Sequence, residues 1–255
     1  MNISIVGYGR MGKIVESLAL KEGLKVKSTI DPIAKESTHK EINESSLKDV
    51  DVCIEFSSPE VVIDNIKKIS NLGVNHVLAT TGWYDEIEEA KKIIEKAGTG
   101  FIYSSNFSIG VNIFFRIIEN AAKIINKFDE YDIFGYELHH NRKKDSPSGT
   151  AKFIEKILLE NIKRKKSVVE EKLDRRINSE EIHFASVRGG EIPGVHVVGF
   201  DSKADTIELK HTARNREGFA LGSLIAAKWI KGKKGFFTMD DLMKDIILEK
   251  GGKNV

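Results

Sequence analysis

The chain has 255 residues, 40% of them apolar, which is enough for two modest domains or for one domain with a large insertion. Its 40 basic and 38 acidic side chains leave a formal charge of +2, so no strong overall field attracts nucleic acid or anionic lipid, and neither partner is expected. Cys53 is the only cysteine, which excludes an internal disulfide and a cysteine-based metal cluster.

The N-terminal part alternates between short apolar runs and helical patterns. The sequence starts directly in a strand pattern and has no leader-like segment and no apolar run of membrane-spanning length, so a cytoplasmic protein is expected. Apolar runs cover residues 3–6, 24–30, 52–56, 74–79 and 100–103, with helical periodicity between them. This rhythm predicts a parallel sheet with helical crossovers.

A glycine-rich turn stands where the first strand gives way to the first helix. Gly7, Gly9 and Gly12 have the spacing that allows a tight turn and close approach of the backbone to a pyrophosphate. Asp31 follows Gly12 by nineteen positions, at the end of the second strand, where its carboxylate can accept hydrogen bonds from ribose hydroxyls. The sequence therefore predicts a dinucleotide site of the Rossmann type.

Further polar loops follow the later strands of this sheet. Ligands of open parallel sheets bind beyond the carboxyl ends of the strands. The loops there are small and polar, and they hold Ala79, Thr80 and Thr81 after one strand and Ser104, Ser105, Asn106 and Phe107 after another. They suit a flat nicotinamide ring, although small polar loops are common at strand ends.

The pattern changes after residue 107. A helical stretch at 110–128 leads into period-two alternation at 131–139, and strand-like segments recur at 183–187, 195–200 and 206–211. We expect a fold of the α/β class, with a Rossmann-type domain at 1–107 that the C-terminal helices of 213–255 complete, and a smaller α+β domain with a mixed sheet at 108–212. The basic run at 163–166 is predicted to be a solvated helix end.

Residues 137–151 concentrate the polar chemistry of this second domain. Ser146 and Pro147 resemble a helix cap with a following proline, so Ser148, Gly149 and Thr150 are predicted to present backbone N–H groups at a helix N-terminus. With His140 and Lys143 close by in the sequence, this terminus favours an anion such as a carboxylate or phosphate. Histidine titrates near neutral pH, so general acid chemistry is the preferred interpretation of the histidine pair.

A metal site is the alternative for the same segment. Glu137, His139, His140 and Asp145 all carry possible ligand atoms. No helical histidine-pair spacing is present, however, and the neighbouring cations at 142–144 repel a divalent ion, so no metal is expected.

Four motifs together resemble one known family. They are Gly-x-Gly-Arg-Met-Gly at 7–12, Thr-Thr-Gly at 80–82, Asn-Phe-Ser-Ile-Gly-Val-Asn at 106–112, and Glu-Leu-His-His-x-x-Lys-x-Asp-Ser-Pro-Ser-Gly-Thr-Ala at 137–151, with Ser-Val-Arg-Gly-Gly at 186–190 as a further element. The sequence is similar along its whole length to the dihydrodipicolinate reductases of lysine and diaminopimelate biosynthesis. Ser146 departs from the alanine usual in the family, which exchanges one small residue for another.

The resemblance implies an activity and a set of site residues. The family reduces a cyclic unsaturated imine dicarboxylate with a hydride from NADH or NADPH and then protonates the adjoining carbon, and it is commonly a homotetramer formed through the sheet of the second domain. Carried over to this sequence, proton donation involves His139 and Lys143, and substrate carboxylate is held by His140, Lys143, Gly149 and Thr150. The implied cofactor contacts are Gly7, Arg10, Met11, Gly12, Asp31, Ala79, Thr80, Thr81, Ser104, Ser105, Asn106 and Phe107, with Gly9 added from the glycine pattern itself.

Two other classes and one choice of cofactor stay open at this point. The alternatives are a different dinucleotide enzyme, such as an amino-acid dehydrogenase, and a catalytically silent dinucleotide-binding module. Asp31 favours NADH over NADPH, because a carboxylate repels the 2′-phosphate and the next residue, Pro32, offers neither a cation nor an N–H group. Lys35, the next basic residue, is the side chain that would recruit NADPH.

Overall fold

The computed structural model describes residues 1–248 and divides the chain into two compact units. The first unit joins Met1–Ile109 to the C-terminal segment that begins at Arg216, and the second unit is Gly110–Asn215. Each unit has its own sheet and hydrophobic core.

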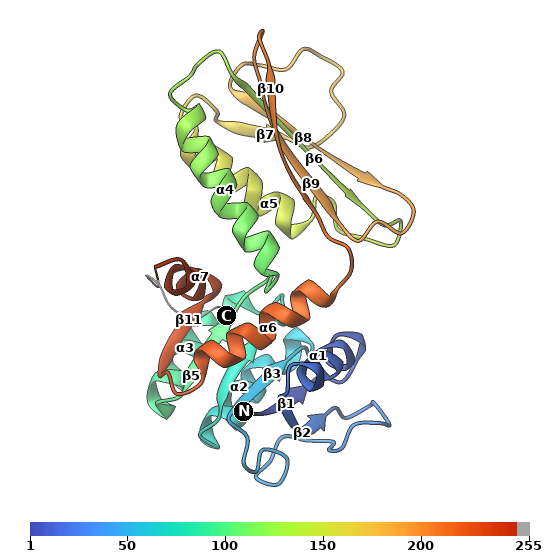
Figure 1. Cartoon of the computed structure of the whole chain (residues 1–255), viewed down its shortest axis with the longest axis vertical. Coiled ribbons are helices and arrows are strands. Elements are labelled where there is room, and N and C mark those ends of the chain that lie inside the picture. The colour runs from blue at the N-terminus through green and yellow to red at the C-terminus, as the bar shows by residue number, and fades with distance from the viewer. Residues whose placement is uncertain (249–255) are drawn as a thin grey trace. The chain divides into compact units, whose positions relative to one another are not determined.

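The first unit is a parallel sheet with helices on both faces (Figure 1). The sheet has six strands in the order β11-β5-β4-β3-β1-β2, and every recorded pairing is parallel. The strands are β1 (Asn2–Val6), β2 (Lys25–Ile30), β3 (Val52–Glu55), β4 (Asn75–Leu78), β5 (Gly100–Tyr103) and β11 (Gly235–Thr238). Since β2 and β3 flank β1 on opposite sides, the strand order reverses at β1, and a ligand crevice is expected beyond its carboxyl end.

The helices of this unit divide between the two faces of the sheet. One face packs against α1 (Arg10–Lys21), α6 (Glu217–Ile230) and α7 (Met239–Leu248). The other face packs against α2 (Val62–Asn71) and α3 (Ile87–Ala97), each preceded by a 3-10 turn, η1 (Pro59–Val61) and η2 (Tyr84–Glu86). Because both faces are covered, the central strands read as continuous apolar runs, and all four residues of β3 are buried.

The second unit is a mixed sheet with two helices on one face (Figure 1). Its strands lie in the order β10-β9-β6-β8-β7, with bounds β6 (Asp132–His139), β7 (Ser167–Val169), β8 (Glu181–Arg188), β9 (Val195–Asp201) and β10 (Thr206–Thr212). The pairs of β8 with β6 and β7 are parallel, and those of β9 with β6 and β10 are antiparallel. The covering helices are α4 (Ile109–Ile125) and α5 (Gly149–Asn161). The predicted fold class is confirmed.

The alternation along β6 decides which of its side chains meet the helices. Burial follows a strict period of two, so Ile133, Glu137 and His139 are buried and Phe134 is half-buried. Ile133 belongs to the core that contains residues of α4 and α5, which identifies the buried face as the helix-covered one. A carboxylate and an imidazole are therefore placed on the inner face of the sheet.

The basic run at 163–166 differs from its prediction. Helix α5 ends at Asn161, and Lys165 lies beyond it with only 3% of its surface exposed. Its ammonium donates to Asp132 Oδ1 at 2.5 Å and to the carbonyl oxygens of Ser179 and Glu181 at 2.7 and 2.8 Å. Lys165 thus ties together segments of the second unit, because a buried ammonium is stable only when its N–H donors are satisfied.

Candidate active site

The glycine turn between β1 and α1 is shaped for close approach of a ligand. Gly7 has φ of +83°, and a Cβ there would collide with the carbonyl oxygen of Phe56, while a Cβ at Gly12 would collide with the carbonyl oxygen of Gly7. No side chain caps the N-terminus of α1 at Gly9, where the space around the α-carbon is open. These residues fit a dinucleotide pyrophosphate, whose charge would meet the N-terminus of α1.

Asp31 is held in place by the backbone around it. Its carboxylate accepts three hydrogen bonds of 2.8 Å, from the N–H groups of Tyr8, Ile33 and Ala34. Burial opposes ionisation, but these bonds outweigh it and lower the pKa of Asp31 below its usual value. Asp31 therefore carries a fixed negative charge beside the glycine turn, since Tyr8 belongs to that turn.

The other expected cofactor residues lie at the same edge of the sheet, beyond the carboxyl ends of β4 and β5. The hydroxyl of Thr80 accepts the N–H of Ser57 at 2.9 Å, which links the loop after β4 to the loop after β3. The hydroxyl of Ser104 donates to the carbonyl of Asn106 at 2.9 Å. Of the remaining members, Arg10, Thr81 and Ser105 are exposed, Met11 and Ala79 are half-buried, and Phe107 is buried.

Phe107 is fixed from behind by a helix that comes from the other end of the sequence. A Cβ on Gly222 of α6 would collide with the carbonyl oxygen of Phe107, so only glycine lets the helix pack this closely. Both residues belong to the first unit. The C-terminal segment therefore supports one of the expected cofactor loops.

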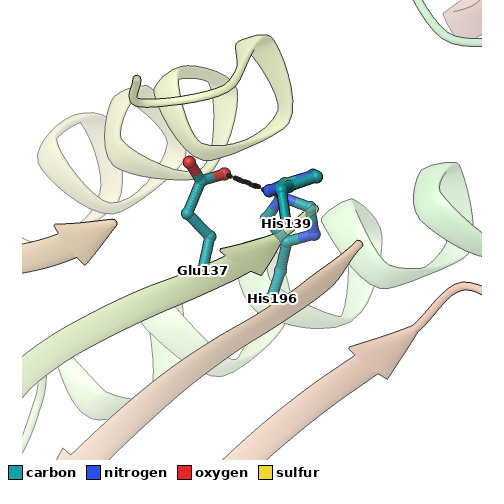
Figure 2. Close-up of side chains that lie close together, drawn as sticks. All are labelled: Glu137, His139 and His196. Carbon is teal, nitrogen blue, oxygen red and sulfur yellow. Dashed lines mark ion pairs between the residues drawn. The ribbon is translucent and has the colours of Figure 1, made fainter. Parts of the chain in front are cut away.

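In the second unit, Glu137 is the centre of a buried polar cluster (Figure 2). Its carboxylate is fully buried and accepts Ser148 N–H at 2.9 Å, Ser186 O–H at 3.0 Å and Arg188 Nη2 at 2.7 Å, together with a hydrogen bond from the Ser148 hydroxyl. Figure 2 shows that Glu137 and His139 project from the same side of β6 and that His196 of β9 lies beside them. The Oε2 atom of Glu137 lies 3.4 Å from His139 Nδ1 and 3.3 Å from His196 Nε2.

The cluster sets the protonation of its members. Burial opposes the charge of Glu137, but hydrogen bonds from His196, Ser148 and Arg188 prevail and hold the pKa of Glu137 far below its usual value. Burial also lowers the pKa of His139 to about 4, because the charge of Glu137 only partly compensates. In this state the carboxylate is ionised and the His139 imidazole is neutral at pH 7.

Helix α5 begins two residues later than the sequence suggested. The cap is Ser148, whose hydroxyl accepts the N–H of Ala151 at 3.1 Å, whereas Ser146 lies before the helix and is exposed. The Ser148 N–H group, expected to be available to a ligand, donates to Glu137 instead. Next to it Gly149 is exposed, with no atom within 4 Å of the position a Cβ would take, so a ligand has room there.

The remaining predicted residues line the loop between β6 and α5. Lys143 is half-buried, and its ammonium donates 2.7 Å hydrogen bonds to both carboxylate oxygens of Asp145. His140 of the same loop is also half-buried, and so is Thr150, the second residue of α5. Lys143 thus supplies a cation in the loop that connects His139 to the N-terminus of α5.

Three residues of the cluster were missed at the sequence level. Ser186 and Arg188 come from β8, and His196 comes from β9. The Ser-Val-Arg-Gly-Gly motif did mark the first two, but nothing in it connects them with Glu137. His196 carries no local signal, since only the antiparallel register of β6 and β9 pairs it with Glu137.

The same cluster contains the side chains that come closest to a metal site. Ligand atoms of Glu137, His139 and His196 lie within 4.8 Å of one another, a group that differs from the one considered in the sequence by His196 in place of His140 and Asp145. The guanidinium of Arg188 lies 2.7 Å from the same carboxylate and supplies its countercharge. This geometry favours a polar cluster that is already neutralised over a cation site.

The fold and the site define a class of protein. A parallel sheet with a glycine turn and an ionised acid beside it fits a nicotinamide dinucleotide, and in the second unit an imidazole and a helix terminus suited to an anion both lie against Glu137. Such a chain is a dinucleotide-dependent oxidoreductase that acts on an acidic substrate. Among the described residues, no helix has the length and apolarity needed to cross a membrane.

Comparison with known proteins identifies the family. The profile "Dihydrodipicolinate reductase, N-terminus" matches residues 1–107, and "Dihydrodipicolinate reductase, C-terminus" matches residues 110–243. The 4-hydroxy-tetrahydrodipicolinate reductase of Christiangramia forsetii is 37% identical over 249 residues, which are 96% of this chain and 99% of the relative. That of Archaeoglobus fulgidus is 38% identical over 264 residues, covering 96% of this chain and 100% of the relative. The protein belongs to the dihydrodipicolinate reductase family.

A solved structure shows the same fold. The dipicolinate-bound dihydrodipicolinate reductase from Paenisporosarcina sp. TG-14 matches with a TM-score of 0.77 at 22% identity, and the match covers 95% of this chain and 99% of that one. The match to this structure shows the fold, and the family profiles and curated relatives confirm the family resemblance noted in the sequence.

Proposed function

We propose that the protein reduces 4-hydroxy-tetrahydrodipicolinate to tetrahydrodipicolinate, a step of lysine and diaminopimelate biosynthesis, with a reduced nicotinamide dinucleotide as hydride donor. Family membership over both units supports the reaction. The observation in the second unit that carries it is a buried imidazole, His139, on the strand that leads into the cation Lys143 and the N-terminus of α5. Binding of a dicarboxylate requires cationic groups, and its reduction requires a proton donor.

Different residues are proposed to bind the cofactor and the substrate. The bound dinucleotide supplies the hydride, and the residues around the glycine turn and Asp31 hold it. His140, Lys143, Gly149 and Thr150 bind one substrate carboxylate, which adds negative charge beside His139. That charge favours the protonated imidazole and offsets the burial that keeps the pKa of His139 at about 4 in the structure.

Protonation completes the reduction. When the hydride forms a C–H bond at one end of the conjugated system, an electron pair is left on the adjoining carbon. His139, assisted by Lys143, gives its proton to that carbon and returns to the neutral state, which its buried surroundings already favour. The conjugated system arises when the 4-hydroxyl group of the substrate leaves as water, so the net result is the loss of one water and the addition of one hydride and one proton; neither addition needs a metal.

NADH is the proposed preferred cofactor and NADPH the alternative. Asp31 is ionised and repels a 2′-phosphate, and Pro32 next to it has no N–H to donate. The cation that acts on Asp31 is Lys40, whose ammonium donates to the carbonyl of Ala34 at 2.5 Å, while Lys35 is exposed. Lys40 therefore joins Lys35 as a cation that could bind the 2′-phosphate of NADPH.

A homotetramer formed through the second sheet is part of the proposal. Helices α4 and α5 cover one face of that sheet, and the alternation along β6 turns Phe134, Tyr136 and Leu138 to the other face. Val187 of β8 pairs with Leu138 and is 51% exposed. An apolar sheet face of this kind is suited to pack against another copy.

The proposed cofactor and substrate are cellular metabolites, so we place the enzyme in the cytoplasm.

The test is oxidation of NADH or NADPH by the purified protein, followed at 340 nm, when the substrate is generated by the preceding synthase. We expect oxidation that depends on the synthase and a higher kcat/KM with NADH. The control is the same mixture without synthase, with amino acids and the oxidised dinucleotide, which detects an amino-acid dehydrogenase. Dinucleotide binding without turnover in either mixture would instead indicate a silent binding module.

A further inference from the structure

Glu137 has no role in the proton donation proposed for His139 and Lys143, yet it is the most extensively hydrogen-bonded side chain of the polar cluster. Four hydrogen bonds reach its carboxylate from Ser148, Ser186 and Arg188, which lie before α5 and on β8. The side chain has no exposed surface. A carboxylate held by this many hydrogen bonds has a fixed position, so it can orient a side chain that lies next to it.

The neighbour that matters for the reaction is His139. Its Nδ1 atom lies 3.4 Å from Glu137 Oε2, is buried, and has no hydrogen-bond partner among the described residues. On the opposite side of the ring, Nε2 lies 3.1 Å from the point where a Cβ on Gly194 would be. The imidazole is therefore placed with one nitrogen toward the carboxylate and the other toward a position that glycine keeps open.

The same carboxylate is bonded to the substrate-binding helix terminus. Ser148 donates to it from both its N–H group and its hydroxyl, and Ser148 is the cap of α5, next to Gly149 and Thr150. One side chain thus links the histidine to the turn that is proposed to hold the substrate carboxylate. A displacement of either element would be transmitted through Glu137 to the other.

We propose that Glu137 is a positioning residue, which fixes the His139 ring with its proton on Nδ1 and keeps that ring in register with the N-terminus of α5. This inference rests on the proposed reductase function. A carboxylate that faces Nδ1 makes Nε2 the nitrogen that releases a proton to substrate, and it stabilises the imidazolium before the transfer. Without it the ring can rotate or carry its proton on the wrong nitrogen.

Several charged groups lie near His139, and each of them raises or lowers its pKa. Glu137 of β6 favours the imidazolium, whereas His196 of β9, Lys143 of the following loop and Arg188 of β8 disfavour it. Glu137 is the one group among these that supports the acid form. Removing its charge is therefore expected to make His139 harder to protonate as well as less well oriented.

The first experiment compares Glu137→Gln with Glu155→Gln. Glu155 is a second buried carboxyl of the same unit, on α5, so its variant controls for loss of a buried acid. For Glu137→Gln we expect kcat to fall about 10- to 100-fold, as part of the 10²- to 10⁴-fold contribution typical of a general acid, with NADH affinity unchanged. The solvent deuterium isotope effect on kcat should rise while the isotope effect of deuterated NADH falls, because protonation becomes slower. Glu155→Gln should change none of these.

The second measurement does not require the Glu137→Gln variant. The ¹⁵N chemical shifts of His139 in the wild-type protein, assigned by their absence in His139→Gln, report which ring nitrogen carries the proton at pH 7. We expect Nδ1–H. A ring with its proton on Nε2 would overturn the proposal, and this result is accessible even if Glu137→Gln does not fold.

The possible outcomes distinguish a failure of the proposed reductase function from a failure of the positioning role of Glu137. A wild-type protein without synthase-dependent activity refutes the proposed function, whatever the ring tautomer. An active wild type with Nδ1–H and a Glu137→Gln variant slow in protonation supports the positioning role. An active wild type whose Glu137→Gln variant keeps its kcat and isotope effects refutes the positioning role alone.

Discussion

Glu155 offers a test of the electrostatics of the second unit through its stability. The side chain lies on α5 with 5% of its surface exposed, and its Oε1 atom is buried without a hydrogen-bond partner among the described residues. Burial and the nearby carboxylate of Glu170 raise the pKa of Glu155 to about 7, against a weaker opposing effect of Lys152, whose ammonium lies 3.7 Å away. Glu155 is thus protonated in the folded protein well above the pH at which a free carboxyl ionises.

The sign of the pH dependence follows from this rise. Between the ordinary pKa of 4.5 and about 7, the folded protein holds a proton on Glu155 that the unfolded chain has lost, so stability decreases as pH rises through this window. Each pKa unit corresponds to about 1.4 kcal/mol, which makes the full loss about 3 kcal/mol above pH 7. Replacing Glu155 by Gln keeps the shape and removes the ionisation.

The assay is urea unfolding of wild type and Glu155→Gln, followed by circular dichroism at pH 4.5 and at pH 8. Relative to wild type, the variant should gain about 2 to 3 kcal/mol of unfolding free energy between the two pH values. Glu160→Gln is the matched control on the same helix, because its side chain is 60% exposed and should show no such gain. An equal difference between Glu155→Gln and wild type at both pH values would mean that Glu155 ionises like a free carboxyl.

Four further substitutions test the site. His139→Gln should lower kcat about 100-fold or more with little change in the NADH dissociation constant measured by fluorescence, and an unchanged kcat would remove His139 from the mechanism. Lys143→Ala should lower kcat and raise the substrate KM together, because its ammonium is proposed to serve both binding and protonation; a change confined to the dinucleotide constant would contradict its placement. Asp31→Ala should narrow the difference between NADH and NADPH in kcat/KM, mainly by weakening NADH binding, whereas a wild-type preference for NADPH would show that a cation such as Lys35 or Lys40 outweighs the carboxylate. Gly12→Ala should weaken NADH binding, because the added Cβ would collide with the carbonyl oxygen of Gly7, and unaltered binding would contradict the tight turn.

Much of the first unit was predictable because its signals are local. Each parallel strand is a short apolar run, and the glycine turn with Asp31 needs only a strand before it and a helix after it. Strand β11 was not anticipated. Its four residues, Gly235–Thr238, are too few to show a period, and their strand conformation depends on pairing with β5 from a distant part of the sequence.

The second unit was predictable in its alternation and less so in its contacts. The period of two predicted at 131–139 is observed, and it places Glu137 and His139 on one face of β6. Lys165 was misplaced because a run of cations normally lies in solvent, and only the fold supplies the acceptors that bury it. The start of α5 was misplaced for a similar reason. Both Ser146 and Ser148 can cap a helix, and Glu137 selects Ser148 by bonding to it.

The partners of Glu137 show why a site can be located from sequence before its mechanism can be inferred. The residues proposed to approach substrate lie within one segment, 137–150, so a motif identifies them together. The residues that contact Glu137 from outside this segment, Arg188 and His196, come from two strands on either side of β6, and their order in the sequence says nothing of their distance from Glu137. Orientation is a property of the sheet register, since a slip of β9 by one residue against β6 would turn His196 to the opposite face and leave a valine beside the carboxylate. The register that builds the hydrophobic core of the second unit is therefore the same register that assembles its acid, and selection for either one maintains the other.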